Sequence, residues 1–164
     1  MKTKIKKNTK TPMLAALLCV LLLIVSMFLP YMTVEEDFRE LAEAMEQDPS
    51  LSLYDFAVTY LEQNEPAFPT VLGILMGLTV LAALFAIFRK PVLVMLFDIM
   101  ITGLAVLIHA IFAQSTRGYA MSIADPLIFT ACAGLLISAV WMLAAKVKTK
   151  KKAAAARRRA AARA

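Results

Sequence analysis

The sequence predicts an all-α integral membrane protein: a four-helix bundle with a short extracytoplasmic helical hairpin between its first and second spans. Hydrophobic residues make up 60% of the 164 residues and charged residues 18%, whereas soluble domains contain roughly 45–50% apolar residues. A soluble core of this size could not bury so many apolar side chains. The apolar residues also gather in four runs, each long enough to cross a hydrocarbon layer about 30 Å thick. We therefore expect one membrane domain covering residues 1–164.

The four expected spans cover residues 12–32, 68–88, 91–113 and 126–147. Their apolar runs are continuous rather than alternating, which indicates helices, because only helices or closed barrels satisfy the backbone in lipid. The first run is long and no small-x-small cleavage site follows it, so we interpret it as an uncleaved signal anchor. Pro91 directly after the turn Arg89-Lys90 makes the second and third spans antiparallel neighbours.

The charges predict how the chain is threaded. Basic residues form three blocks: five Lys within residues 1–10, the turn at 89–90, and nine basic residues from Lys146 onward. The connection 33–67 holds ten acids and one base, Arg39. Four spans place all three basic blocks on one side, as the positive-inside rule expects. We therefore expect a multi-pass plasma-membrane protein with both termini in the cytoplasm, an arrangement that suits a bacterial cell.

The outer connection 33–67 is expected to form an acidic helical cap. The capping box Thr33-x-x-Glu36 begins a first helix and Ser52-x-x-Asp55 a second. Apolar residues follow at helical spacing, namely Phe38, Leu41 and Met45 in the first helix and Leu53, Phe56, Ala57, Tyr60 and Leu61 in the second. The acidic face is either a docking surface for a basic partner or a cation, or a solvated surface without a ligand.

The cytoplasmic tail 148–164 is basic and rich in helix formers, so span four can continue into it as one helix. Anionic lipid headgroups are the partner expected at the basic termini, alongside the lipid bilayer itself. Nucleic acid is not expected, because no aromatic residue is interleaved with the basic ones.

Small residues at four-residue spacing mark the expected helix contacts, since close backbone approach drives helix packing in lipid. The pairs are Gly73 with Gly77 in span two and Gly134 with Ser138 in span four. The Gly73-x-x-x-Gly77 motif is equally compatible with a homo-oligomer or a membrane-protein partner.

Asp98 within span three is the most informative single residue. An Asp at a helix centre costs about 2.5–3.5 kcal/mol on insertion scales, so it should face the bundle with a partner or a proton. The other candidate members of this intramembrane polar site are Thr79, Thr102, His109, Ser138 and Trp141.

Three interpretations of Asp98 stay open. Protonated Asp98 forms a structural hydrogen bond with Ser138, Thr79 or Trp141; or it handles a proton or cation with His109 as a second station; or it pairs with a basic residue of another subunit. Thr102 and His109 share the face of Asp98 in a helix.

Enzymatic chemistry is not expected, and neither is a cofactor or metal. Cys19 and Cys132 are single cysteines in separate spans, and no Gly-x-Ser-x-Gly, His-Glu-x-x-His or phosphate-loop motif occurs. Asp125-Pro126 is interpreted as the start of span four, too far from Asp98 to share a proton. We expect a non-enzymatic accessory or structural subunit that binds a partner through the acidic cap or a bundle face. The alternative is a small transporter or ion- or proton-handling protein that uses Asp98.

Overall fold

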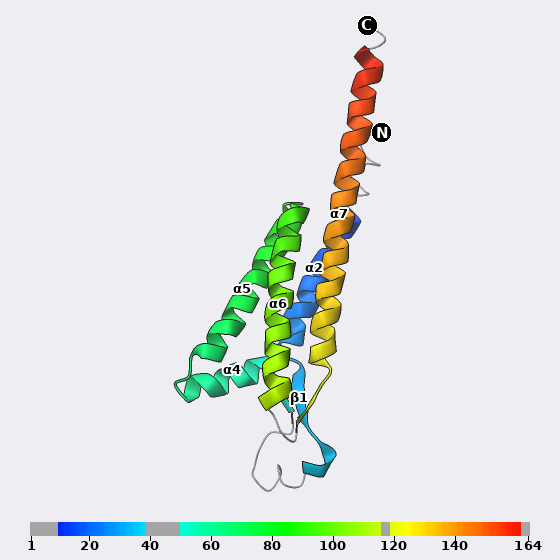
Figure 1. The fold of residues 1–164 in the computed structure, drawn as a ribbon. Coiled ribbons are helices and arrows are strands. Elements are labelled where there is room, and N and C mark those ends of the chain that lie inside the picture. The colour runs from blue at the N-terminus through cyan, green and yellow to red at the C-terminus, as the bar shows by residue number, and fades with distance from the viewer. Residues whose placement is uncertain (1–9, 39–49, 116–118, 162–164) are drawn as a thin grey trace.

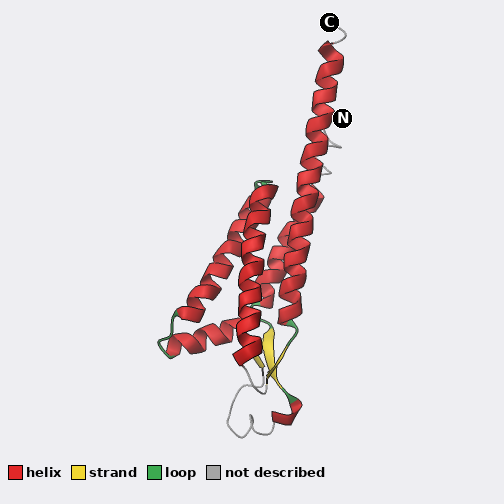
Figure 2. Ribbon diagram, viewed as in Figure 1, coloured by secondary structure: helices red, strands yellow, loops and turns green. Residues whose placement is uncertain are grey.

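Long apolar helices dominate the structure, a computed structural model that describes residues 10–38, 50–115 and 119–161 (Figures 1 and 2). Three of them, α5 (Ala67–Ile87), α6 (Pro91–Ser115) and α7 (Ala124–Ala161), are long and apolar enough to cross a membrane. They coincide with the second, third and fourth expected spans. The protein is therefore a mostly helical membrane protein.

The first apolar helix, α2 (Lys10–Ser26), is shorter than the expected span at residues 12–32. Its 17 residues extend about 25 Å at 1.5 Å per residue. Ser26 Oγ donates to the carbonyl of Leu23 at 2.8 Å, and Pro30, which has no backbone N–H, begins a strand four residues later. The first apolar helix therefore ends at Ser26 and not at residue 32 as expected.

The four apolar helices pack side by side. α6 lies between α5 and α7, and α2 packs against both α7 and α5. Figure 1 shows α5 leaning away from α6 toward the end at which α4 lies. The buried side chains at the centre include Leu23, Leu75, Ile101 and Leu135. The opposite helix faces expose large apolar side chains, as contact with lipid requires.

A three-stranded antiparallel sheet lies at one end of the helices, where only helices were expected. Its order is β2 (Ser50–Ser52), β1 (Pro30–Val34), β3 (Tyr119–Met121). Thr33 pairs with Ser50 on one side and Ala120 on the other, so the helix start predicted at Thr33 is wrong, whereas residues 39–49 of that predicted helix lie outside the described residues. A short 3₁₀ turn, η1 (Glu36–Phe38), follows β1, and the predicted residues Leu41 and Met45 lie outside the described residues.

The second cap helix is confirmed as α4 (Leu53–Glu62), with its predicted capping box. Ser52 Oγ accepts from the Asp55 backbone N–H at 3.1 Å, and Asp55 Oδ2 accepts from the Ser52 backbone N–H at 2.9 Å. Leu53 and Ala57 are buried, and the Phe56 ring lies 4.6 Å from that of Phe112 on α6. The apolar face of α4 therefore lies on the bundle.

The basic tail continues α7 without a break as far as Ala161. Figure 1 shows this extension projecting well beyond the other helices. The expected continuation of span four is confirmed over the described part of the tail, and residues 162–164 lie outside it.

Candidate functional site

Asp98 occupies a core position of α6. It lies on the buried face of this helix with Val94, Ile101 and Ala105, and only 2% of its surface is exposed. Its Oδ1 has no hydrogen-bond partner among the described residues. Since buried polar atoms are almost always hydrogen-bonded, an unpaired carboxylate oxygen at this depth is unusual.

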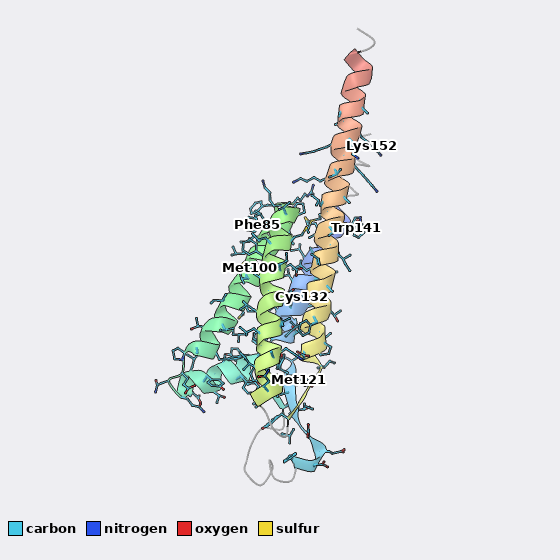
Figure 3. The ribbon with its side chains drawn as sticks, in the orientation of Figure 1. Phe85, Met100, Met121, Cys132, Trp141 and Lys152 are labelled. Atoms are coloured by element: carbon cyan, nitrogen blue, oxygen red, sulfur yellow. The ribbon has the colours of Figure 1, made fainter. Side chains whose placement is uncertain are left out.

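The expected donors to this oxygen are arranged differently from the prediction. Thr79 Oγ1 donates instead to the Leu75 carbonyl of its own helix at 2.8 Å. Ser138 is buried in the bundle, whereas 49% of the Trp141 surface is exposed. Figure 3 places Trp141 on α7 near the start of the basic tail. None of the three donates to Asp98 Oδ1, so the predicted structural bond to this atom is not formed in the described part of the chain.

Two cysteine thiols lie near Asp98. Cys19 of α2 and Cys132 of α7 are free cysteines close enough to interact electrostatically with its carboxyl. Thr102, one turn along α6 from Asp98, lies within hydrogen-bonding reach of the Cys132 thiol. We call Cys19, Asp98, Thr102 and Cys132 the inner polar pocket. The name stands for these four side chains and not for a cavity. They come from α2, α6 and α7, and α7 packs against both other helices; Figure 3 shows Cys132 on the stretch of α7 beside α2.

His109 belongs to a different group of residues, at the sheet end of the bundle. Its Nδ1 lies 2.9 Å from Asp125 Oδ1, and the Tyr31 hydroxyl donates to the same oxygen at 3.0 Å. We call Tyr31, His109 and Asp125 the outer polar cluster; it connects β1, α6 and α7. Asp125 was not among the predicted site residues. Its place at the start of one span, across a short connection from a His near the end of the previous one, is the signal that could have identified it.

The environment of Tyr31 fixes its hydrogen-bonding role. Burial, the nearby Asp125 carboxylate and the hydrogen bond to it raise the pKa of Tyr31 above its usual range, so the hydroxyl stays protonated and donates. The Tyr31 ring packs edge-on against Phe112 at 5.5 Å, and His109 packs edge-on against Phe129 at 5.8 Å. The outer polar cluster thus joins the sheet to the bundle through the buried Tyr31–Asp125 hydrogen bond and the partly buried His109–Asp125 contact.

The predicted packing residues divide into two kinds. A Cβ on Gly134 would lie 2.7 Å from Cys19 Sγ, so α2 and α7 approach closely because this residue is glycine. Gly73 and Gly77 have open space where a Cβ would be. Gly134 therefore packs within the chain as predicted, whereas the Gly73-x-x-x-Gly77 motif lies on an exposed face of α5.

Two basic blocks meet at the other end of the bundle. Lys146 Nζ, at the start of the tail, donates to the Arg89 carbonyl in the turn between α5 and α6 at 3.2 Å. The described residues hold no group of three or more His, Cys, Asp or Glu that could bind a metal ion.

Comparisons with known proteins give no match among protein-family models, curated proteins or solved structures.

Proposed function

We propose that the protein is a multi-pass plasma-membrane subunit, non-enzymatic, that binds a partner protein through a surface outside the membrane. This surface, here called the outer platform, consists of β1, β2, β3, η1 and α4. One observation carries the proposal: strands from two separate connections form one sheet, and the partly buried outer polar cluster fixes that sheet to α6 and α7. A platform held in this way presents its exposed residues in a constant geometry, which lowers the entropic cost of binding.

The proposed thread has four crossings, with α2 as the first. In support, α2 packs along α7 and α5, and apolar residues continue from Met27 to Leu29 after the helix ends. A helix a few Å shorter than the hydrocarbon layer is accommodated by local thinning at modest cost. Four crossings also place the three basic blocks, which include Lys10, Arg89 and Lys146, on the cytoplasmic side.

The partner surface that we propose is acidic with an apolar centre. Glu35, Glu36 and Asp37 are exposed, and beside them Phe38 exposes 44% of its surface. An exposed aromatic side chain is a typical interface anchor, and charges around it select a partner of opposite sign. We infer that the partner is a membrane protein with a basic segment outside the membrane.

At the inner end, we propose that the first turns of the tail, from Lys146 to Lys152, bind anionic headgroups of the same membrane. Each base near such a leaflet contributes about 1 kcal/mol. The helix rises about 1.5 Å per residue, so its backbone at Arg157 is already about 17 Å beyond Lys146, twice a Debye length of about 8 Å. Headgroup binding is thus assigned to the Lys residues.

Charge reversal on the platform tests the partner proposal. The double variant Glu35→Lys/Glu36→Lys should lower the recovery of co-purifying membrane proteins at least tenfold, measured by quantitative mass spectrometry after mild detergent extraction. The matched control, Lys148→Glu/Lys150→Glu, changes as many charges at the inner end and should leave the recovery unchanged. Equal recovery from wild type and both variants would contradict the proposal.

A second candidate function, ion or proton handling, is favoured by one observation: Asp98 Oδ1 is buried without a hydrogen-bond partner in the described chain. Polar residues of this kind inside membranes mark ion pathways and proton relays. Proteoliposomes with an internal pH-sensitive dye test this function. Wild-type protein should then carry protons in response to a membrane potential, and Asp98→Asn should not; silent wild-type liposomes would exclude transport by the isolated chain.

A further inference from the structure

The geometry points to a proton as the ligand of Asp98, exchanged with the side of the membrane on which the basic residues lie. We propose that the inner polar pocket is a proton-binding site that makes the packing of α6 against α7 depend on pH at that side. This inference deepens the second candidate function, because it names the bound species at the same carboxyl. It does not require that the proton cross the membrane.

The donor set of the pocket favours a proton over a metal cation. Ca²⁺ takes six to eight oxygen ligands and Mg²⁺ needs an octahedral set. The pocket contributes one carboxyl group, the Thr102 hydroxyl and two thiols, and the described residues contain no metal-binding group of three or more. A proton needs only the unpartnered oxygen of Asp98.

Burial gives the reason for a bound proton. An ionised carboxylate inside an apolar bundle is costly unless a positive charge or several donors compensate it. Asp98 is 2% exposed, and the described residues form no ion pair with it and donate no hydrogen bond to its Oδ1. A proton on Oδ1 neutralises the carboxyl and turns that oxygen into a hydrogen-bond donor.

The position of Asp98 along the bundle gives the direction of exchange. Seven residues of α6, about 10 Å, separate it from Pro91 at the basic end. Toward the other end lie about 26 Å of α6. Buried Ile101, Ala105 and Ile108 line that stretch, opposite buried Ile128 of α7. This apolar layer separates the inner polar pocket from the outer polar cluster.

The titratable groups that face Asp98 are few. α2 contributes Cys19 and α7 contributes Cys132. The buried face of α5 carries apolar residues and Thr79, and none of these titrates. Ordinary thiols stay protonated below about pH 8. Replacing His109 by Gln removes the imidazole from the measurement, so that the pH dependence between 5 and 8 reports on Asp98.

Infrared spectroscopy of the full chain in lipid tests the proposal directly. At pH 6, wild type should show the C=O stretch of a protonated carboxyl, which shifts in D₂O because the proton exchanges, and Asp98→Asn should lack this band. Asp125→Asn, at the other end, is the matched control and should retain it. Absence of the band from wild type would overturn the proposal. If Asp98→Asn fails to fold, Asp98→Glu takes its place and should shift the band; an unshifted band would assign it to another group and also overturn the proposal.

The sign of the pH dependence supplies a second measurement. The folded bundle binds a proton that the unfolded chain releases, so stability should fall as pH rises from 5 to 8. In a His109→Gln background, the unfolding equilibrium constant should increase up to about tenfold per pH unit. The double variant His109→Gln/Asp98→Asn should lose this pH dependence. If its unfolding equilibrium constant changes with pH as much as that of His109→Gln alone, proton binding at Asp98 is refuted. If wild-type proteoliposomes carry no protons but the infrared band of protonated Asp98 is present, transport is rejected and proton binding is retained.

Discussion

At the scale of single residues, the two polar groups of this protein have different tasks. The outer polar cluster is satisfied: Asp125 accepts from Tyr31 and contacts His109. The inner polar pocket contains an unsatisfied carboxyl oxygen. A satisfied buried group stabilises a structure, whereas an unsatisfied one needs a ligand or a proton.

Removal of Asp125 should weaken the attachment of the sheet. Asp125→Ala leaves the buried Tyr31 hydroxyl without its acceptor, which should cost about 1–3 kcal/mol of unfolding free energy. Denaturant unfolding in detergent micelles measures the loss. Glu36→Ala, at an exposed position, is the control and should change stability by less than about 0.5 kcal/mol. Equal stability of Asp125→Ala and wild type would show that the cluster does not hold the platform.

The glycines provide a second residue-scale prediction. Gly134→Ala places a methyl group 2.7 Å from Cys19 Sγ, so the thiol or the helix has to shift, and this variant should be less stable than Gly77→Ala. Gly77→Ala meets open space and gains helix propensity, so it should be neutral or slightly stabilising. The same unfolding assay compares them. Adding Cys19→Ala should restore the Gly134→Ala variant; failure of this rescue would locate the strain elsewhere.

The sequence predicted the burial of Asp98, because the insertion cost of a charge in lipid requires it. Its neighbours were harder to predict, since they depend on how each helix is rotated. Ser138 and Trp141 lie three residues apart, yet the first is buried and the second half exposed. The contact between His109 and Asp125 joins two helices, a relation that spacing within one helix does not reveal.

At the scale of elements, α4 depends on its capping box. Ser52→Ala removes the acceptor for the Asp55 backbone N–H, and loss of such a cap costs about 0.5–2 kcal/mol. Hydrogen exchange of the amides in Leu53–Glu62 should then accelerate. Thr59→Ala, which removes an exposed bond to the Asp55 carbonyl, is the control and should leave exchange at the start of α4 unchanged. Similar acceleration in both variants would contradict the role of the cap.

Element prediction succeeded where the signal was local and failed where it was not. Long apolar runs identified α5, α6 and α7, and Ser52-x-x-Asp55 identified α4. β2 and β3 are three residues each, too short for a periodic pattern. The wrong helix start at Thr33 has the same origin, because strand pairing with two distant segments overrides a local capping pattern.

At the scale of the whole molecule, the outer platform and the basic tail lie at opposite ends of the apolar helices (Figure 1). This separation agrees with the charge pattern, since the acidic connection 33–67 contributes to the platform and the basic residues gather at the other end. The proposed function therefore requires one arrangement in the membrane, with the acidic outer platform outside the cell and the basic tail in the cytoplasm.

Two-sided cysteine labelling tests that arrangement most directly. Single variants Glu36→Cys and Lys148→Cys are treated in intact cells with a membrane-impermeant maleimide, and wild type controls for labelling of Cys19 and Cys132 within the bundle. We expect that Glu36→Cys is labelled in intact cells and that Lys148→Cys is labelled only after the membrane is opened. Labelling of Lys148→Cys in intact cells, or protection of Glu36→Cys, would contradict this arrangement.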